Sequence, residues 1–192
     1  MSHKMEKEAN YLSNHLLIAM PSLKDSNFAH TVSLICEHNE EGAMGFVLNR
    51  PTELHISDLF EHMDIDVTAP LEKNHVLHTG GPVQPDRGFV IHSPIGSWES
   101  TLELTTNIGI TASRDILNAI AAGQGPEKHI ITLGYAGWSG GQLEQEIVEN
   151  SWLSVPADIQ LVFDTADSQL WKASASQLGI DISTLTTEAG HS

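Results

Sequence analysis

Residues 31–48, TVSLICEHNEEGAMGFVL, contain two apolar runs on either side of a polar turn. The runs, residues 31–38 and 43–48, are rich in the β-branched and aliphatic side chains that favour strands. The intervening Asn39-Glu40-Glu41-Gly42 is typical of a turn, because asparagine and glycine tolerate the backbone angles that turns require. We therefore predict a β-hairpin here, within a mixed and largely antiparallel sheet.

Further strands and helices are predicted on both sides of this hairpin. Apolar or alternating runs predict strands at residues 15–20, 76–79, 88–92, 101–105, 129–133 and 158–163. Helical spacing and capping residues predict helices at residues 57–62, 113–123, 142–150 and 168–177. We infer an α+β fold, one compact domain with a mixed, largely antiparallel sheet flanked by helices. The alternative is a three-layer α/β sandwich, since strands and helices alternate in the second half.

The length of 192 residues suits one domain with its own hydrophobic core. We predict a flexible leader at residues 1–10, a single domain at residues 11–187 and a tail at residues 188–192. The leader lacks the apolar segment of a secretory signal. The longest early apolar run, residues 16–20, is far shorter than the roughly 20 residues that cross a bilayer. These features predict a soluble, cytoplasmic protein.

The charge balance is strongly acidic, with nine Lys and Arg against 25 Asp and Glu and a formal net charge of −16. Binding to a nucleic-acid backbone depends on cations that neutralise phosphates, and the three arginines, Arg50, Arg87 and Arg114, are scattered along the chain. Direct binding to nucleic acid or to an anionic membrane surface is therefore excluded from the expected functions. The expected partner is another protein or a small molecule, and the composition leaves the oligomeric state open.

The cysteine and histidine content argues against a metal site. Cys36 is the only cysteine, so the chain has neither an internal disulfide nor a cysteine metal cage. None of the 11 histidines falls in a spaced ligand motif, and we predict no metal and no cofactor. Cys36 and His38 alternate along one predicted strand, so a histidine-activated thiol is one hypothesis. We favour the other, a buried and unreactive thiol.

Gly137-Trp138-Ser139-Gly140-Gly141 matches the G-x-S-x-G nucleophile elbow of hydrolases, between a predicted strand and a predicted helix. The elbow requires a downstream histidine as base, and the only candidate, His191, falls in the predicted tail. We therefore expect a chain without a complete catalytic constellation, in which Ser139 begins the helix. The same glycines could also present backbone N–H groups to an anion, although a tight turn is the favoured interpretation.

Glu144 interrupts an apolar arc on the next helix. If that helix spans residues 142–152, successive side chains advance by about 100°, and Glu144 falls near the middle of the arc. The arc consists of Leu143, Ile147, Val148 and Trp152. A buried carboxylate needs a partner, and we predict pairing with Arg50 or Arg87. The alternative is that Glu144 reaches solvent at the helix N-terminus, where its charge is favourable.

The functional version of this prediction is one binding patch formed from several segments of the chain. Its candidate members are Asn49, Arg50, Arg87, Tyr135, Trp138, Gln142 and Glu144. We assign none of them a catalytic, cofactor-binding or metal-binding role. A carboxylate retained beside arginine, amide and aromatic groups is typical of a binding site.

Seven motifs in order resemble the AlgH/YqgE family of bacterial proteins, over about residues 10–192. They are His15-Leu16-Leu17-Ile18-Ala19-Met20-Pro21, Ile35-Cys36-Glu37-His38-Asn39, Gly42-Ala43-Met44-Gly45, Asn49-Arg50-Pro51, Gly80-Gly81-Pro82-Val83, Asp86-Arg87-Gly88-Phe89, and Tyr135-Ala136-Gly137-Trp138 followed by Gly141-Gln142-Leu143-Glu144. The resemblance implies a bacterial cytosolic protein with a compact domain of mixed sheet and flanking helices, and it carries over no catalytic residue.

The family name comes from a proposed role in regulating alginate synthesis. A direct transcription factor is disfavoured by the charge, so the resemblance implies an indirect regulator acting through a protein partner. The alternative is a small-molecule or anion-binding sensor, and a serine hydrolase using Ser139 is the least favoured hypothesis. A flat apolar patch would favour a partner, and a concave pocket with polar groups would favour a ligand.

The charge generates a first prediction. At moderate salt the purified protein will not retard duplex DNA in a gel-shift assay, because 16 net negative charges oppose the release of counterions that supplies nonspecific affinity. A salt-sensitive complex at submicromolar protein would contradict this expectation.

Overall fold

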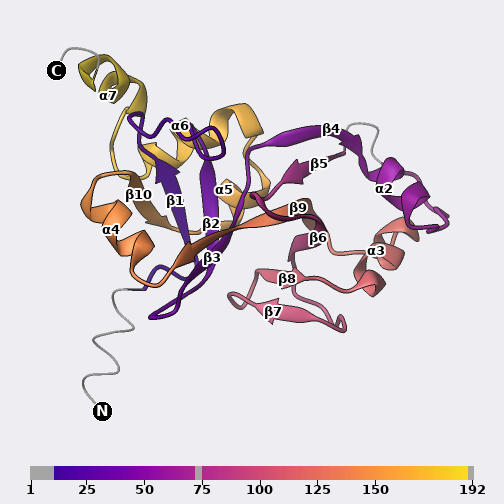
Figure 1. Cartoon of the computed structure of the whole chain (residues 1–192). Coiled ribbons are helices and arrows are strands. Elements are labelled where there is room, and N and C mark those ends of the chain that lie inside the picture. The colour runs from indigo at the N-terminus through magenta and orange to yellow at the C-terminus, as the bar shows by residue number, and fades with distance from the viewer. Residues whose placement is uncertain (1–10, 72–74, 190–192) are drawn as a thin grey trace.

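The computed structural model describes residues 11–71 and 75–189, and its body is a curled ten-stranded sheet (Figure 1). Eight strands follow the order β10-β1-β2-β3-β9-β6-β8-β7, and β4 and β5 branch from β9. The strand β5 runs parallel to β9, and the other described pairings are antiparallel. The strands are β1 His15–Ala19, β2 Val32–Asn39, β3 Gly42–Val47, β4 Pro51–His55, β5 Val76–Thr79, β6 Val83–Ser93, β7 Thr101–Glu103, β8 Gly109–Thr111, β9 Lys128–Ser139 and β10 Trp152–Pro156.

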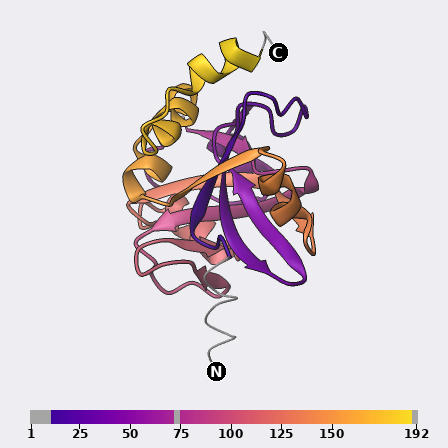
Figure 2. The ribbon, with the colours of Figure 1, turned by 90° about the vertical axis from the view of Figure 1, so that its left-hand side faces the viewer.

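Six described helices flank this sheet. They are α2 Ile56–His62, α3 Arg114–Ala121, α4 Gln142–Val148, α5 Ile159–Phe163, α6 Asp167–Ser176 and α7 Ile182–Ala189. Figure 2 shows α6 and α7 on one side of the curled sheet and α4 on the other. None of the described helices is long and apolar enough to cross a membrane. The α+β fold with a mixed, largely antiparallel sheet is confirmed.

The predicted hairpin is present as β2 and β3. Asn39 pairs with Gly42 at the turn, and a β-bulge between Ile35 and Glu37 leaves Cys36 as the extra residue. Gly42 has a φ of +141°, and a Cβ there would lie 2.1 Å from the carbonyl oxygen of Trp138. The turn glycine is therefore required by the close approach of β9 as well as by its own backbone angles.

The long strand β9 differs from the prediction of a strand at residues 129–133 followed by a glycine-rich turn. It continues to Ser139, because its C-terminal half finds a partner in β3 after its N-terminal half has paired with β6. Gly134, with a φ of +75°, lies between the two halves, where a Cβ would be 2.5 Å from the carbonyl oxygen of Gly81. Tertiary hydrogen bonds thus make a strand from a segment whose composition favours a turn.

Two further predictions were wrong near the C-terminal half. Residues 158–163 form the helix α5, whose N-cap Asp158 accepts a hydrogen bond from the backbone N–H of Gln160, and not a strand. A short apolar run cannot be assigned by periodicity alone, and the capping residue decides it here. The helix α4 ends at Val148, so Trp152 begins β10 instead of extending the helical arc. The predicted domain, residues 11–187, stays a prediction, and the helix α7 extends from Ile182 to Ala189 across its C-terminal bound. The predicted leader, residues 1–10, lies outside the described residues.

Both faces of the sheet are covered, so β1 is apolar on both sides. Leu16 and Ile18 join the main core beneath α5, α6 and α7. Leu17 and Ala19 join a second cluster on the opposite face, beneath α4. A third cluster fills the space between α2, α3 and the sheet. This double burial explains the unbroken apolar run of β1, since a strand covered on one face only would alternate.

Cys36 belongs to the main core and is 5% exposed. Burial, and secondarily the charge of Glu37, raises the pKa of the Cys36 thiol well above its usual range. The prediction of a buried thiol is confirmed, and the thiolate needed for redox chemistry is strongly disfavoured.

The carboxylate of Glu146 anchors the helix α4 to two strands of the sheet. Glu146 Oε1 accepts hydrogen bonds from the indole Nε1 of Trp138, at 3.0 Å, and from the indole Nε1 of Trp152, at 2.9 Å. Its Oε2 accepts from the side-chain amide of Gln142 at 2.9 Å. The two indoles come from β9 and β10, which are not paired, and their rings lie 6.1 Å apart. Glu146 therefore joins strands that the backbone ladder keeps separate.

A second prediction follows from this anchor. Glu146→Ala leaves two buried indole donors without their acceptor and will lower the free energy of unfolding by ~2–4 kcal/mol. Urea denaturation followed by tryptophan fluorescence measures it. The matched control is Glu149→Ala, since Glu149 lies exposed on the same turn of chain and accepts only from Gln145; its expected effect is within about 0.5 kcal/mol. Equal losses in the two variants would contradict the anchoring role.

Candidate functional site

The structure distributes the predicted patch over separate places. Asn49 and Arg50 hold the loop before β2: the Asn49 amide donates to the carbonyl of His30, and Arg50 donates to the carbonyl of Ala29. Trp138 and Gln142 meet at Glu146, where the Trp138 side chain is buried. The predicted residues therefore do not line one common surface.

Arg87 and Tyr135 belong to another region, around Phe89. The guanidinium of Arg87 lies 5.0 Å from the centre of the Phe89 ring. The Tyr135 ring meets the same phenyl ring edge to face, with centroids 6.1 Å apart. Only these two members of the predicted patch share an aromatic neighbour.

The predicted pairing of Glu144 with an arginine is wrong. The Glu144 side chain is 47% exposed, and its Oε1 lies 2.7 Å from Nε2 of the buried His38. The Nδ1 of His38 accepts the backbone N–H of Leu12 at 3.0 Å, so Nε2 carries the proton and donates to Glu144. The alternative, an exposed Glu144 at the start of the helix, is confirmed. The predicted apolar arc required a helix that continues to Trp152. The helix α4 ends at Val148, which is itself 76% exposed, so the arc does not form.

Ser139 lies at the end of β9, and its polar groups form hydrogen bonds with the side chain of Gln142. Its hydroxyl and its backbone N–H both donate to Gln142 Oε1, at 3.2 and 2.9 Å. His191, the only histidine after Ser139 in the sequence, lies outside the described residues. Within the described part of the chain, Ser139 thus has an amide partner and no histidine beside it.

No carboxylate among residues 11–71 and 75–189 forms an ion pair with any of the three arginines, although the chain has 25 acidic residues. Among the described residues, the carboxylates that contact a basic side chain join Asp164 to Lys128 in an ion pair, and Glu144 and Asp167 to the imidazoles of His38 and His78. The arginine side chains contact carbonyls, an amide or a ring instead. Since a guanidinium stays charged and has five donors, these residues keep donors available for another anion.

Two of these arginines border one cleft, which we call the α2–α3 cleft. It encloses about 370 Å³, within the range of small-molecule pockets. Its apolar wall comes from α2, α3, β6 and β9, and its polar rim comes from the start of α3 and the bend of β6. The apolar members are Leu59, Met63, Phe89, Val90, Leu117, Ile131 and Leu133, and the polar members include His62, Asp86, Arg87, Thr111, Ser113 and Arg114. Figure 1 shows α2 and α3 together at the end of the molecule away from α4.

The rim of the cleft is fixed by Arg114, which joins its two helices. The guanidinium of Arg114 donates to the carbonyl of Met63, at 2.5 Å, just past the end of α2. Asp115, the next residue, accepts from the Ser113 hydroxyl and from the backbone N–H groups of Glu99 and Ile116. Although desolvation raises the pKa of Asp115, these hydrogen bonds together lower it below its usual value. The rim carries two arginines against the one carboxylate of Asp86.

Comparisons with known proteins place the chain in a family. A sequence profile described as AlgH-like matches residues 16–183. The UPF0301 protein AlgH of Pseudomonas aeruginosa strain PAO1 is 48% identical over 187 residues, covering 97% of this chain and 98% of that protein. The chain belongs to the AlgH family. The resemblance inferred from the seven motifs is thereby confirmed.

Further relatives agree with this membership. The UPF0301 protein Tgr7_2910 of Thioalkalivibrio sulfidiphilus is 50% identical over 187 residues, covering 97% of this chain and all of that protein, 100%. The solution structure of AlgH from Pseudomonas aeruginosa matches with a TM-score of 0.76 and 47% identity, over 92% of this chain and 94% of that one. The crystal structure of protein DIP2367 from Corynebacterium diphtheriae, at 21% identity, shares the fold, with a TM-score of 0.70 over 91% of each chain.

Sequence reasoning found Arg87 in this AlgH-family chain but missed its neighbours in the cleft. Arg114 was counted only as one scattered charge, and His62 and Phe89 were not singled out as site residues. Arg114 directly follows Ser113, the predicted helix cap, so its position at the start of α3 could be read from the sequence. Its proximity to Met63, 51 residues earlier, could not.

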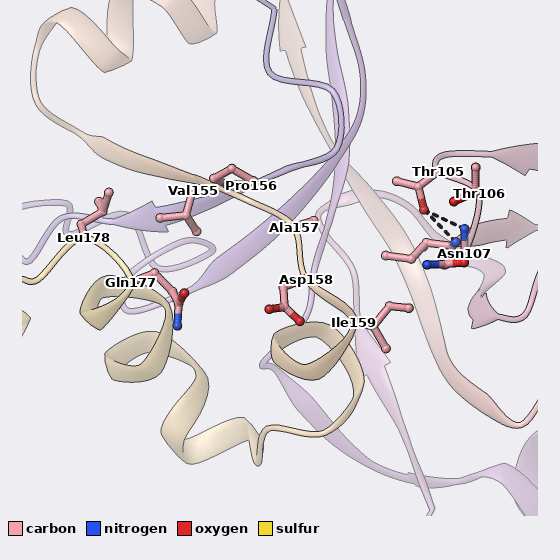
Figure 3. A pocket seen from close by; sticks show the side chains of 11 residues that line it. Thr105, Thr106, Asn107, Val155, Pro156, Ala157, Asp158, Ile159, Gln177 and Leu178 are labelled. Carbon is pink, nitrogen blue, oxygen red and sulfur yellow. Dashed lines mark hydrogen bonds between the residues drawn. The ribbon is translucent and has the colours of Figure 1, made fainter.

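A hollow with a larger volume than the cleft has a different chemistry (Figure 3). It encloses about 660 Å³ between the β7–β8 turn, the connection from β10 to α5 and the end of α6. No described cation lines it, and its carboxylate, Asp158, caps α5. The Thr105 hydroxyl accepts the backbone N–H groups of Asn107 and Ile108 within the turn. The polar groups of this groove are thus largely occupied by local structure.

A histidine pair lies in another pocket, beside the ion pair of Lys128 with Asp164. The rings of His75 and His129 stack with centroids 4.6 Å apart. Desolvation, followed by the nearby His75 and His92, lowers the pKa of His129 to about 4. No group of three or more potential ligands that could hold a metal ion occurs among residues 11–71 and 75–189. His129 is therefore a neutral ring at physiological pH.

A third prediction concerns the effect of His129 on the stability of the fold at acidic pH. Its folded-state pKa is about 4, below the unfolded value of 6.5, so the unfolded state binds more protons between these values. The contribution of the neutral His129 ring to the free energy of unfolding is complete above pH 6.5. It is lost as the pH falls toward 4, by up to about 3 kcal/mol. Urea unfolding at a series of pH values gives the free energy of unfolding as a function of pH. Between pH 6.5 and 4 this free energy will fall less steeply in His129→Gln than in the wild type. His62→Gln, on the exposed side of α2, will keep the wild-type slope; a wild-type slope in His129→Gln would contradict the assignment.

Proposed function

We propose that this AlgH-family chain is a small-molecule sensor that binds an organic anion with an apolar body in the α2–α3 cleft. The observation that carries the proposal is a pair of arginines on the rim of an apolar cleft, neither of which forms an ion pair with a carboxylate in the described part of the chain. Arg114 and Arg87 stand on different elements, so an anion between helix and sheet can meet both. Ligand binding would then be the input to the indirect regulation that the sequence suggests.

The lining of the cleft specifies the chemical class of the ligand. Phe89 and Leu117 are 5% and 9% exposed, and with Ile131 they form an apolar wall that favours a hydrocarbon or aromatic group. The guanidinium groups favour a carboxylate, sulfonate or phosphate, because they can donate two parallel hydrogen bonds to it. An apolar body with an acidic head satisfies both parts of the lining.

The net charge of the chain further restricts the class of ligand that the cleft can bind. At long range a net charge of −16 repels anions, and the attraction of two arginines acts only near the rim. A strongly charged, purely polar anion therefore gains little. A ligand that also buries apolar surface gains a contribution that salt does not screen.

The alternative of a regulator that acts through an apolar protein-binding patch has less support. The exposed large apolar side chains come from five different segments: β4, the loop after α2, β7, α4 and the loop after α6. They are Leu54, Val67, Leu102, Val148 and Leu178. Single exposed apolar residues are ordinary for a protein surface, whereas a concave site with converging cations is not.

A fourth prediction uses anilinonaphthalene sulfonate, an apolar fluorescent anion, and its uncharged analogue N-phenylnaphthylamine. The native protein will bind the sulfonate with a fluorescence increase, and Arg87→Gln will weaken binding about tenfold, because one charge-assisted contact is lost. The uncharged analogue will bind both proteins alike. Arg87 is the first choice because it is exposed and, among the described residues, its side chain forms a hydrogen bond with Gln84 and a cation–π contact with Phe89.

The matched control is Arg50→Gln, which removes one positive charge outside the cleft. Sulfonate affinity will stay at the wild-type value in this variant. The double variant Arg87→Gln/Arg114→Gln will lose a further factor of about ten. Equal weakening by Arg50→Gln, or no weakening by Arg87→Gln, would show that the probe does not use the cleft and would overturn the proposal.

A further inference from the structure

We infer that Arg50 forms a second, smaller binding site that takes a phosphate-sized oxyanion. The site is a pocket of about 260 Å³ near the end of β3, distinct from the α2–α3 cleft. Its lining consists of Ser26, Asn27, Val47, Arg50, Pro51, Thr79, Gly81 and Pro82. This inference does not depend on the function proposed for the cleft.

Arg50 supplies the charge of this pocket. Its side chain is half-buried, and its Nη2 donates to the carbonyl oxygen of Ala29 at 2.7 Å. No carboxylate among the described residues forms an ion pair with it. A partly desolvated cation that has one carbonyl as partner is under-compensated, and a bound anion would supply the missing charge.

Neighbouring hydroxyl groups extend the set of donors. Ser26 and Thr79 line the pocket, and neither hydroxyl makes a hydrogen bond with the other described residues. The backbone N–H of Thr79 donates to the carbonyl of Arg50 at 2.9 Å, which fixes the two residues side by side. Asp25, which precedes Ser26, and Glu53, three residues after Arg50, do not line the pocket, and the Asp25 carboxylate accepts the backbone N–H of Asn27. An oxyanion would meet donors on several sides.

The walls of the pocket are held in place by backbone contacts. Val47 donates from its backbone N–H to the carbonyl of Gly80, and Gly80 donates to the carbonyl of Leu133 in β9. A Cβ at Gly81 would lie 2.2 Å from the backbone of Tyr135, so the segment between β5 and β6 packs directly against the backbone of β9. Asn49 fixes the opposite wall, since its side chain accepts from the backbone of Val32 and donates to the carbonyl of His30. The backbone that carries Arg50 and Thr79 is thus held in place, which lowers the entropy lost on binding.

The lining also indicates the size and class of the ligand. The pocket has less volume than the cleft and offers only Val47 and the two prolines as apolar side chains. Arginine with hydroxyl donors is the combination that recognises phosphate and related oxyanions. The ligand is therefore a free oxyanion or the phosphate group of a small phosphomonoester.

The fifth prediction exploits the three arginines of the chain, whose side-chain Nε–Hε groups give three NMR signals that single Arg→Lys variants assign. Titration of the full chain with inorganic phosphate, against chloride at equal ionic strength, will move the Arg50 signal saturably, with a Kd on the order of 1 mM. The Arg87 and Arg114 signals will move by less and without saturation. Phenyl phosphate in a second titration separates the two ligand sources: tighter binding identifies a phosphomonoester, and weaker binding identifies the free oxyanion.

Thr79→Val tests the site without touching the bond from Arg50 to Ala29. This variant will weaken phosphate binding about threefold to tenfold, because one hydroxyl donor is lost. The control Thr68→Val changes an exposed threonine outside the pocket and will leave the affinity unchanged. An Arg50 signal that does not saturate, or that moves in parallel with the other two, would overturn the inference. The anilinonaphthalene sulfonate result at Arg87 would remain unaffected, so the two proposals fail separately.

Discussion

The hydrogen bonding of β9 is the constraint on which the rest of the structure depends. This strand of 12 residues is hydrogen-bonded to β3, β5 and β6, and it thereby joins the two halves of the chain. Gly134 within this strand and Gly42 and Gly81 beside it each stand where a Cβ would overlap backbone atoms of a neighbouring segment. The curled sheet therefore depends on backbone groups approaching one another more closely than side chains would permit. The α2–α3 cleft and the Arg50 pocket both lie against elements that β9 holds in register.

Hydrogen bonds of polar side chains connect segments of the chain in addition to the backbone hydrogen bonds of the sheet. Glu146 connects the indoles of two unpaired strands, and His38 connects Glu144 to the backbone of Leu12. His92 is fully buried, accepts the Thr111 hydroxyl at Nε2 and donates from Nδ1 to the carbonyl of Pro94. Its pKa is lowered by desolvation, against the opposing effect of the Pro94 carbonyl. These buried groups are satisfied by specific partners, which favours a single arrangement of the helices on the sheet.

The electrostatics of the chain separate its acidic surface from its arginines. Acidic residues are numerous, yet the three guanidinium groups contact carbonyls, an amide and a ring. Arg87 and Arg114 border an apolar cleft, and Arg50 borders a polar pocket, so the same type of cation serves two different surroundings. The surroundings decide the ligand: apolar walls add burial to charge in the first case, and hydroxyl groups add hydrogen bonds in the second.

The sequence by itself determined the fold class, the β2–β3 hairpin, the strand character of β1, the burial of Cys36 and membership of the AlgH family. These features depend on local patterns of apolar, turn-forming and capping residues, which act over a few positions. It did not determine the end of β9, the helix α5 or the strand β10, because short apolar or glycine-rich segments adopt the structure that their tertiary partners impose. The site shows the same division. Arg87 and Arg50 could be singled out by residue type, but the partner of Glu144 could not be identified, because His38 lies 106 positions away. Only the tertiary structure separated the predicted patch into the cleft, the pocket and the Glu146 anchor, because contacts between distant residues are set by strand register and helix docking rather than by spacing along the chain.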